Sequence, residues 1–319
     1  MTIDPLPIRS VLFVPANRED RMHKALTVGA DAIILDLESA IPRGEATVAR
    51  RMVRDLLEAH RPPRPAVFVR VSEIGSPDFA ADLEAAVHPN LAGILLPQVE
   101  GVTDVQRASA ALDLADPAGR IVLWPLVETA SAVRDAYEIA RASDRIAYFG
   151  AGVSRDGDIA RSIGYRWTPE GQETLYLRSK VLIDSRAAGI FNPLTGIWGN
   201  VDDLDGLRAF AQQARDLGYE GLQCIHPKHL PVIHDIFTPS ATDIAHWQAV
   251  IDAMIEAEKQ GSAAIRLDGR LVDVAHVKTA HKNLDRARRL GLRASSTKRV
   301  MRRRDLAVLE CRVVHRRGA

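Results

Sequence analysis

The stretch Ile121–Arg141, IVLWPLVETASAVRDAYEIAR, contains the unit from which the fold is built. Its first six residues, Ile121–Leu126, form a continuous apolar run, which predicts a strand buried on both faces. Glu128 follows this run, and Ala130–Arg141 has the apolar spacing that is typical of a helix. The stretch therefore predicts a strand–helix unit with a carboxylate where the strand ends.

The same unit recurs along the chain. Similar apolar runs predict strands at Val11–Val14, Ala32–Leu35, Ala66–Val71, Gly93–Leu96, Arg145–Phe149, Gly189–Phe191 and Gly221–Ile225. Helical patterns follow these runs at Arg18–Val28, Glu45–Glu58, Phe79–Val87, Asp104–Asp113, Glu170–Ala188, Val201–Leu217 and Leu230–Phe237. Eight such units in a row favour a closed (β/α)₈ barrel, or TIM barrel, over an open doubly wound sheet. We expect this α/β barrel to occupy residues 1–240.

The bulk composition is that of an ordinary globular protein, with 46% hydrophobic and 26% charged residues. No apolar run is long enough to span a bilayer, and the start MTIDPLPIRS lacks the pattern of a signal peptide. Only two cysteines occur, Cys224 and Cys311, which argues against a disulfide framework. We therefore expect a cytoplasmic protein that does not cross a membrane.

Polar residues gather where the predicted strands end, which is where a barrel of this kind carries its reactive groups. They are Asp36, Glu38, Arg70, Gln98, Glu100, Glu128, the loop Gly150–Asp158 and His226. Carboxylates that converge on one mouth indicate a hard divalent cation, and Glu128 and Asp158 are the two expected ligands of a Mg²⁺ ion.

Several other kinds of site are excluded by the motifs that the sequence lacks. It has no CxxC or HExxH pattern, which argues against zinc. No GxGxxG or Walker loop follows a predicted strand, and no Gly-x-Ser-x-Gly elbow occurs. A dinucleotide site, a nucleoside triphosphate site and an α/β-hydrolase site are therefore not expected.

Seven short motifs, taken in order, resemble the HpcH/HpaI aldolase and citrate lyase β-subunit family, which includes malyl-CoA lyases. The motifs are RSVLFVPANRED (Arg9–Asp20), GADAIILDLESAIP (Gly29–Pro42), VFVRV (Val67–Val71), ILLPQVE (Ile94–Glu100), PLVETA (Pro125–Ala130), YFGAG to DGDIARSIG (Tyr148–Gly164) and GLQCIHP (Gly221–Pro227). The resemblance runs from Arg9 to about Leu284. It implies a barrel of the phosphoenolpyruvate/pyruvate type that acts as a Mg²⁺-dependent carbon–carbon lyase.

The resemblance also implies roles for individual residues. Glu128 and Asp158 match the family's Mg²⁺ ligands, and Arg70 matches the clamp for a substrate carboxylate. Asp36 and Glu38 are expected to belong to the substrate-binding site, where they bind water on the metal or orient Arg70.

The C-terminal part of the resemblance concerns a helical arm, residues 241–285. Its segment LDGRLVDVAHVKTA (Leu267–Ala280) looks like an element that packs on a neighbouring subunit, in a homotrimer or a multiple of one. Asp273 in this segment matches the family's catalytic acid/base.

Some positions depart from the family pattern, at Ser39, Ser72 and Gln98. An insertion, Gly152–Gly157, makes Asp156 an alternative to Asp158 as the metal ligand. We favour Asp158 because Asp158–Gly164 keeps the family's spacing.

Three functions stay open at this point. The first is a lyase that cleaves or forms a β-hydroxyacyl-CoA, such as citryl-, malyl- or citramalyl-CoA. The second is a Mg²⁺-dependent aldolase on free hydroxy-keto acids. The third is a non-catalytic subunit that binds a CoA ester. In each case the expected partner is an acyl-CoA or a small carboxylic acid.

The last 34 residues, 286–319, form a basic tail with 12 Lys and Arg against two acidic residues, or +10, which leaves −9 for residues 1–285. This composition predicts a solvated, partly disordered extension. Nucleic acid, an anionic membrane and the phosphates of CoA are alternative partners. The tail has no aromatic residue for base stacking, which argues against nucleic acid.

Overall fold

The computed structural model describes residues 5–39, 41–61 and 65–292. The chain forms two compact units, of which the first ends at Thr238 and the second begins at Pro239. Most of the basic tail, residues 293–319, lies outside the described residues.

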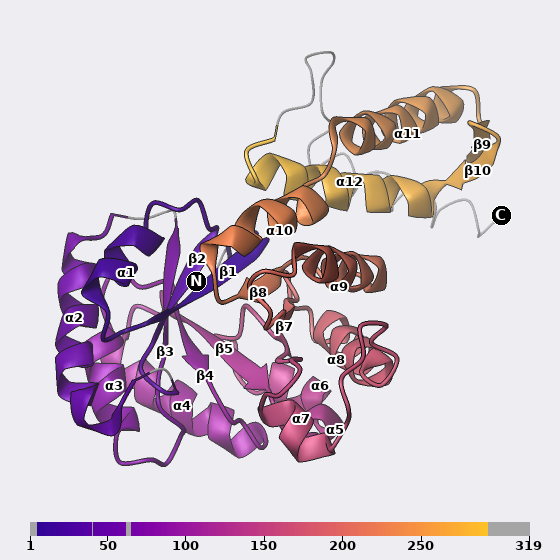
Figure 1. Cartoon of the computed structure of the whole chain (residues 1–319). Coiled ribbons are helices and arrows are strands. Elements are labelled where there is room, and N and C mark those ends of the chain that lie inside the picture. Colours follow the sequence, from indigo (N-terminus) through magenta and orange to yellow (C-terminus); the bar gives the residue numbers. More distant parts are fainter. Residues whose placement is uncertain (1–4, 40, 62–64, 293–319) are drawn as a thin grey trace. The chain divides into compact units, whose positions relative to one another are not determined.

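The first unit is built on one sheet of eight parallel strands that is nearly closed into a barrel (Figure 1). Its strands are β1 (Ser10–Pro15), β2 (Ala32–Asp36), β3 (Ala66–Arg70), β4 (Gly93–Leu96), β5 (Val122–Val127), β6 (Gly150–Ala151), β7 (Thr195–Ile197) and β8 (Leu222–Cys224). Each strand pairs with its neighbour in the order β6-β5-β4-β3-β2-β1-β8-β7. The predicted (β/α)₈ barrel is therefore confirmed.

The ring closes between β6 and β7 through backbone contacts on either side of the two short strands. The Leu194 N–H donates to the Phe149 carbonyl at 3.1 Å, and the Ile197 N–H donates to the Val153 carbonyl at 2.8 Å. Gly150 is required here, since a Cβ on it would lie 1.6 Å from the Leu194 carbonyl oxygen. The two segments therefore approach too closely for a side chain at this position.

Two of the predicted strands were wrong in position. The sixth was expected at Arg145–Phe149, but that segment makes only an isolated bridge, Ile146 to Leu123, and β6 begins at Gly150. The seventh was expected at Gly189–Phe191, whereas β7 begins at Thr195. Gly189 has φ +85 just after the preceding helix, a conformation that serves to end a helix rather than to build a strand.

Helices follow the strands and cover the outside of the barrel (Figure 1). They are α1 (Glu19–Ala25), α2 (Ala46–Ala59), α3 (Phe79–Ala86), α4 (Val102–Ala115), α5 (Ala130–Arg134), α6 (Ala136–Ala140), α7 (Asp158–Ile163), α8 (Leu175–Ala187), α9 (Leu204–Leu217) and α10 (Leu230–Phe237), with short 3₁₀ turns η1 (Arg43–Glu45) and η2 (Pro227–His229). The helix predicted after β5 is split at Asp135 into α5 and α6. An additional short helix, α7, follows β6, and its first residue is Asp158.

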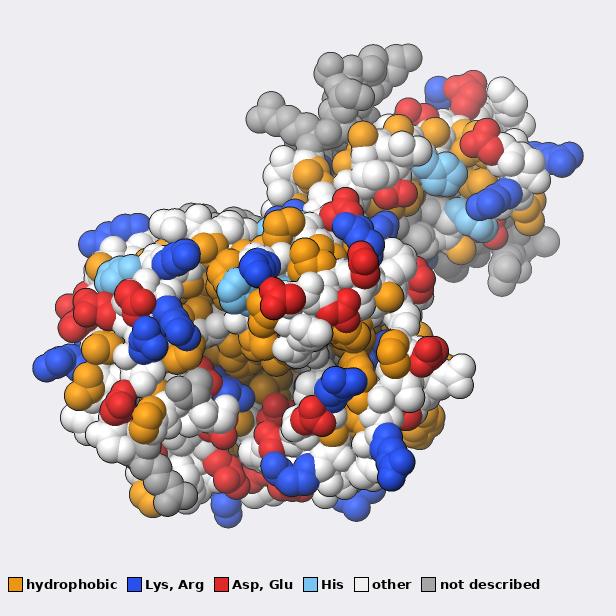
Figure 2. Space-filling view, viewed as in Figure 1, with side chains coloured by type: hydrophobic (Ala, Val, Ile, Leu, Met, Phe, Trp, Pro, Cys, Tyr) orange, Lys and Arg blue, Asp and Glu red, His pale blue; other side chains and the backbone are white. Residues whose placement is uncertain are grey.

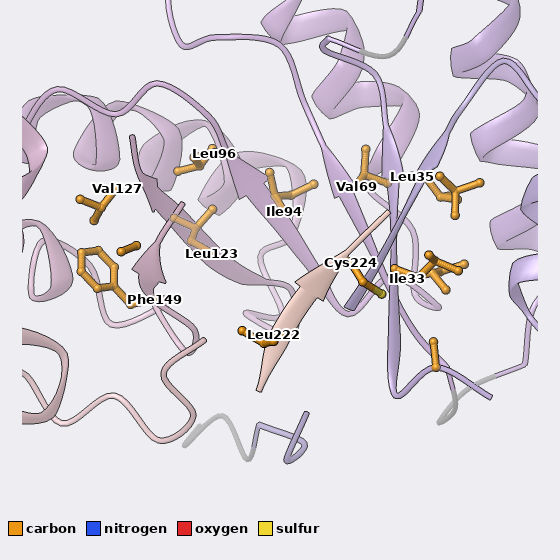
Figure 3. Close-up of a cluster of buried hydrophobic side chains, with 14 of the residues drawn as sticks. Ile33, Leu35, Val69, Ile94, Leu96, Leu123, Val127, Phe149, Leu222 and Cys224 are labelled. Carbon is orange, nitrogen blue, oxygen red and sulfur yellow. The ribbon is translucent and has the colours of Figure 1, made fainter. Parts of the chain in front are cut away.

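The core has two layers because alternate strand residues face opposite sides of the sheet. The barrel interior is filled by a cluster that includes Phe68, Trp124 and Tyr148, whose rings lie 5.4–5.5 Å apart. The layer between strands and helices is mostly aliphatic, with aromatic residues such as Phe149 (Figure 3). It includes Cys224, which is buried and whose pKa is raised to about 12 by burial. This thiol is packing material, as its place within a strand predicted.

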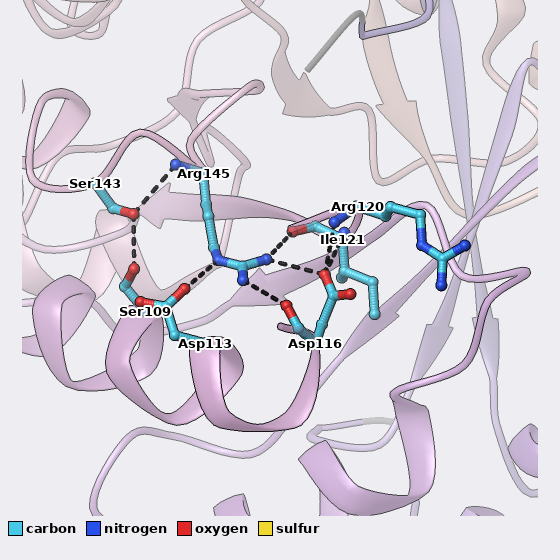
Figure 4. A network of polar contacts seen from close by, with 7 residues as sticks. All are labelled: Ser109, Asp113, Asp116, Arg120, Ile121, Ser143 and Arg145. Atoms are coloured by element: carbon cyan, nitrogen blue, oxygen red, sulfur yellow. Dashed lines mark hydrogen bonds and ion pairs between the residues drawn. The ribbon is translucent and has the colours of Figure 1, made fainter. Parts of the chain in front are cut away.

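A buried polar network ties α4 to the segments that enter β5 and β6 (Figure 4). The Arg145 guanidinium donates to Asp113 at 2.6 Å, to the Asp116 carboxylate at 3.0 Å and to the Ile121 carbonyl at 3.0 Å. The Asp116 carboxylate also accepts the Ile121 N–H at 2.8 Å. These bonds fix where both segments begin.

The second unit contains two long helices and a hairpin. They are α11 (Ala241–Lys259), β9 (Ala264–Leu267), β10 (Arg270–Asp273) and α12 (Val274–Arg289). The hairpin was not predicted. Its two-residue turn, Asp268-Gly269, has positive φ at both positions, which suits the twist of paired strands.

Charged side chains of both signs are scattered over the visible face of the first unit, around a hollow floored by hydrophobic atoms (Figure 2). Within the described ranges, no helix has the length and apolar character needed to cross a membrane.

Candidate active site at the barrel mouth

On three of the strands, the apolar residues of the barrel interior are followed along the chain by a charged residue. On β2, β3 and β5 the buried interior cluster includes Ile34, Phe68 and Leu126. Two residues further along, the same inward faces carry Asp36, Arg70 and Glu128. The structure thus brings three of the residues singled out from the sequence to the carboxyl ends of strands on one side of the barrel.

Asp36 and Arg70 form a buried, two-pronged ion pair. Arg70 Nε donates to Asp36 Oδ1 at 2.7 Å, and Arg70 Nη2 donates to Asp36 Oδ2 at 2.6 Å. The Asp36 side chain is 3% exposed and the Arg70 side chain 11% exposed. This geometry, with both oxygens and two nitrogens engaged, fixes the plane of the guanidinium.

The remaining guanidinium nitrogen, Arg70 Nη1, lies 3.2 Å from Glu38 Oε2. Ser39 also accepts a hydrogen bond from Arg70. Burial by itself lowers the pKa of Arg70, but the bonds to Asp36 and the charge of Glu38 outweigh it and raise the pKa above its ordinary value. Asp36 and Glu38 therefore both contact Arg70, and Nη1 is the nitrogen not bonded to Asp36.

Phe13 on β1 covers the other side of Arg70. The guanidinium carbon lies 5.1 Å from the centre of the Phe13 ring, within the range of a cation–π interaction. Phe13 also packs against the buried interior cluster. It therefore separates the apolar interior from the charged mouth.

Glu128 is a buried carboxylate, and its only protein hydrogen bond among the described residues comes from a backbone amide. The Gln98 N–H donates to Glu128 Oε2 at 3.3 Å. Burial raises the pKa of Glu128 to about 7; Arg70 lowers that pKa, while Asp158 and Glu38 raise it. Burial and the neighbouring carboxylates therefore outweigh the effect of Arg70 on the pKa of Glu128.

Asp156, in the inserted loop, and Asp158, just after it, differ in their relation to Glu128. Asp158 is 33% exposed, pairs with Arg161 at 2.6 Å and is near enough to Glu128 to raise the pKa of that residue. Asp156 is exposed and is not among the main influences on the pKa of Glu128. The geometry therefore agrees with the preference for Asp158, whose role as a ligand stays a prediction.

These residues fit a divalent cation. Asp36, Glu38 and Glu128 lie around the Arg70 guanidinium, and Asp158, which pairs with Arg161, acts on Glu128, so these four carboxylates outnumber the two guanidinium groups beside them. Within the described ranges no group of three or more His, Cys, Asp or Glu side chains is arranged as a complete metal cage. Two carboxylates completed by water and substrate oxygens are what Mg²⁺ commonly accepts.

A pocket of about 370 Å³ opens at the carboxyl ends of β1 and β8, beside α1. Phe13 is one of the residues that line it, and the ring of the same residue contacts Arg70. Its basic lining residues are Arg21, Lys24, His226 and Lys228. The sequence reasoning missed this pocket, although Arg21 and Lys24 are three residues apart in the first helix after β1, a spacing that places both on one face.

Other residues named from the sequence bond elsewhere. Ser72 donates its N–H and hydroxyl to the buried Asp82 at 2.8 and 2.6 Å. His226 accepts the Lys228 N–H at 3.1 Å on Nδ1, as expected of a loop histidine. Glu100 is exposed, and its backbone N–H bonds to Asp104.

Asp273 belongs to the second unit, where it begins α12. Its side chain accepts the Ala275 N–H at 2.9 Å and lies 2.7 Å from His276 Nδ1. The hydrogen bond with His276 lowers the pKa of Asp273. Its catalytic role stays a prediction, as does the packing of this unit on a neighbouring subunit.

Comparison with known proteins relates the whole arrangement to a family. The family model described as HpcH/HpaI aldolase/citrate lyase matches residues 9–227. A (3S)-malyl-CoA thioesterase of Cereibacter sphaeroides is 33% identical over 281 residues, 88% of this chain and 95% of the relative. A citrate lyase subunit beta-like protein of Deinococcus radiodurans is 36% identical, over 86% of this chain and 95% of that protein.

One similar solved structure carries ligands. It is protein CitE of Mycobacterium tuberculosis in complex with magnesium, acetoacetate and coenzyme A, with a TM-score of 0.70 and 28% sequence identity. The match covers 88% of this chain and 98% of that one.

Proposed function

The chain belongs to the HpcH/HpaI aldolase/citrate lyase family, and we propose that it is a Mg²⁺-dependent lyase that cleaves or forms a β-hydroxyacyl-CoA. Family membership makes the chain a lyase, and the relatives connect it with CoA chemistry. The proposal adds the metal requirement and the substrate class, an acyl-CoA joined to a 2-keto acid such as those of citryl-, malyl- or citramalyl-CoA.

The observation that carries this proposal is the pair of neighbouring features at the barrel mouth. Glu128 and Asp158 offer two carboxylates where positive charge is lacking, and Arg70 lies beside them. The basic pocket lined by Arg21 and Lys24 also has Phe13 among its lining residues, and the Phe13 ring contacts Arg70. A polar reacting centre next to a basic, partly apolar pocket suits a substrate that has a small acid at one end and phosphates at the other.

The anionic groups of CoA match this pocket. Lys24, Arg21 and Lys228 offer flexible cations for the phosphates, while Leu12, Val14 and Val28 offer apolar surface. We propose that the nucleotide end of the thioester lies here and that its acyl end reaches past Phe13 toward Arg70.

At the reacting centre, Glu128 and Asp158 would hold the Mg²⁺ ion. When bound, the ion supplies Lewis-acid chemistry that lowers the pKa of the substrate hydroxyl and neutralises its alkoxide. Arg70 Nη1, the nitrogen not bonded to Asp36, would donate to the carboxylate of the keto-acid half, while Asp36 keeps the guanidinium in place.

In cleavage, the hydroxyl proton passes to solvent water, the carbinol carbon becomes the keto carbon, and the electron pair of the broken carbon–carbon bond passes to the thioester enolate. That enolate carbon then takes up a proton. We propose Asp273, from the arm of a neighbouring subunit, as the group that delivers this proton and removes it in the reverse reaction. The lowered pKa of Asp273 favours its carboxylate form, which is the form that the condensation direction needs.

The test is an assay of the purified full chain with Mg²⁺ on a panel of hydroxyacyl-CoAs and the matching free acids. Release of an acyl-CoA and a keto acid from at least one thioester, lost on chelation of the metal, supports the proposal. Cleavage of free hydroxy-keto acids alone would instead identify an aldolase. Binding of CoA esters without turnover would identify a non-catalytic subunit.

A further inference from the structure

Gln98 has an unusual backbone conformation directly after β4. Of the described non-glycine residues, only Gln98, with φ +50, and Asp268, with φ +49, lie in the left-handed region. Side chains other than glycine, asparagine and aspartate seldom adopt this region, because the Cβ comes close to backbone oxygen. Asp268 is explained by its two-residue hairpin turn, whereas Gln98 is in no such turn.

The consequence of this conformation is seen at Glu128. The left-handed backbone of Gln98 turns its N–H toward the neighbouring strand, where it donates to Glu128 Oε2 at 3.3 Å. No other protein group in the described ranges donates a hydrogen bond to this carboxylate, so the second oxygen, Oε1, stays available to a ligand.

Gly152 bounds Glu128 on another side. A Cβ at Gly152 would lie 2.9 Å from Glu128 Cγ and 3.3 Å from Glu128 Oε1. The first distance is shorter than real contacts allow, so any larger residue would push the carboxylate out of place. The N–H of Gln98 thus holds Glu128 Oε2, and the absence of a side chain at Gly152 leaves room for Glu128 Oε1.

We propose that Gln98 and Gly152 are positioning residues that aim Glu128 at the metal: the Gln98 amide holds one carboxylate oxygen, and the missing side chain at 152 gives the other its place. The strain at Gln98 is then maintained by the bond that it makes, as is common for residues with unfavourable backbone angles near functional sites. This inference rests on the proposed role of Glu128 as a metal ligand. It assigns the effect of position 98 to its backbone and not to its side chain.

The test is to measure Mn²⁺ affinity by electron paramagnetic resonance for the wild type and the variants Gln98→Gly, Gln98→Val and Gly152→Ala. Glycine keeps the N–H and accepts positive φ, so Gln98→Gly should bind within about twofold of the wild type. Valine strongly disfavours positive φ, and Gly152→Ala displaces the carboxylate. Both should weaken binding roughly tenfold or more, the range seen when groups that orient a metal ligand are lost.

Matched controls separate positioning from general damage. Asp268→Val places the same backbone conflict in the second unit, and Gly199→Ala adds a Cβ that meets nothing within 4 Å. Both should keep the wild-type Mn²⁺ affinity, and thermal unfolding should show every variant to be folded at the assay temperature.

Two results would overturn the inference: wild-type affinity in folded Gln98→Val and Gly152→Ala, or a loss in Gln98→Gly as large as in Gln98→Val, which would assign the effect to the side chain. Glu128→Gln separates this inference from the proposed function. If Glu128→Gln loses Mn²⁺ but the wild type cleaves no thioester, the positioning stands and the lyase proposal fails. If Glu128→Gln binds Mn²⁺ like the wild type, Glu128 is not a metal ligand and the inference is wrong.

Discussion

Arg70 on β3 donates to both carboxylate oxygens of Asp36 on β2, at 2.7 and 2.6 Å, in a pair that is almost fully removed from solvent. The two residues are also partners in the strand register, so the pairing of β2 with β3 sets them side by side. The guanidinium is thereby held rigid, and Nη1 lies 3.2 Å from Glu38. This arrangement is the basis of our proposal that Nη1 is the nitrogen that would bind a substrate carboxylate.

Replacing Arg70, whose planar guanidinium bonds both Asp36 oxygens, tests this arrangement. Arg70→Lys keeps the charge but cannot bond both Asp36 oxygens and a substrate carboxylate at once. We expect pyruvate affinity, measured by calorimetry in the presence of Mg²⁺, to fall roughly tenfold or more, the value of one hydrogen bond to a charged group. Arg134→Lys, in an exposed pair with Asp135, serves as the control and should bind like the wild type. Unchanged binding by Arg70→Lys would exclude Arg70 from substrate recognition.

We expect the basic pocket to bind only the CoA part of the thioester substrate. Lys24→Ala and Arg21→Ala should each raise KM for the thioester roughly tenfold. We expect kcat to be kept, because contacts made equally in the ground and transition states affect only binding. Lys259→Ala, an exposed lysine of the second unit paired with Glu256, is the matched control. A fall in kcat with unchanged KM would place these side chains at the reacting centre instead.

The Arg145 network should be structural. Arg145→Met removes a side chain that is 10% exposed and leaves Asp116 buried without its cation. Breaking a buried pair in this way costs about 3–5 kcal/mol, which urea unfolding would detect. Arg208→Met breaks an exposed pair with Asp235 and should cost less than about 1 kcal/mol. Equal effects of the two substitutions would show that the network in Figure 4 is not a stability element.

The proposed shared site predicts complementation between subunits. Asp273→Asn and Glu128→Gln should each be inactive, since one lacks the proton-transfer group and the other a metal ligand. Co-expressed as mixed oligomers, they should regain part of the wild-type activity, because one barrel then combines an intact metal site with an intact arm. If verified mixed oligomers stay inactive, Asp273 does not act across a subunit boundary.

Much of the fold followed from the sequence because six of the eight strands coincide with predominantly apolar runs that need burial on both faces. The closing strands could not be placed in this way. Gly150 and Gly196 are required where a Cβ would lie 1.6 Å from the Leu194 carbonyl and 2.3 Å from the Val153 carbonyl. Glycine is uncommon in strands and so does not predict them. Because β6 and β7 need glycine where they approach each other closely, their sequences lack the apolar pattern that identifies the other strands.

The candidate site was predictable to the extent that it depends on strand ends. Asp36, Arg70 and Glu128 meet because parallel strands bring their carboxyl ends to one rim. The backbone amide of Gln98 and the ring of Phe13 were not predictable as parts of the site. Their contribution depends on a φ angle and on a contact between distant strands, neither of which a residue type specifies.

The most direct test of the central claim is the Mn²⁺ affinity of Glu128→Gln, Asp158→Asn and Asp156→Asn, measured beside Mg²⁺-dependent turnover. If Glu128 and Asp158 jointly hold the ion, the first two variants should stay folded, lose turnover and bind Mn²⁺ at least about tenfold more weakly. Asp156→Asn should resemble the wild type in both measurements, because Asp156 is exposed and is not among the main influences on the pKa of Glu128. Wild-type affinity in Asp158→Asn together with loss in Asp156→Asn would contradict the account and move the metal site two residues upstream.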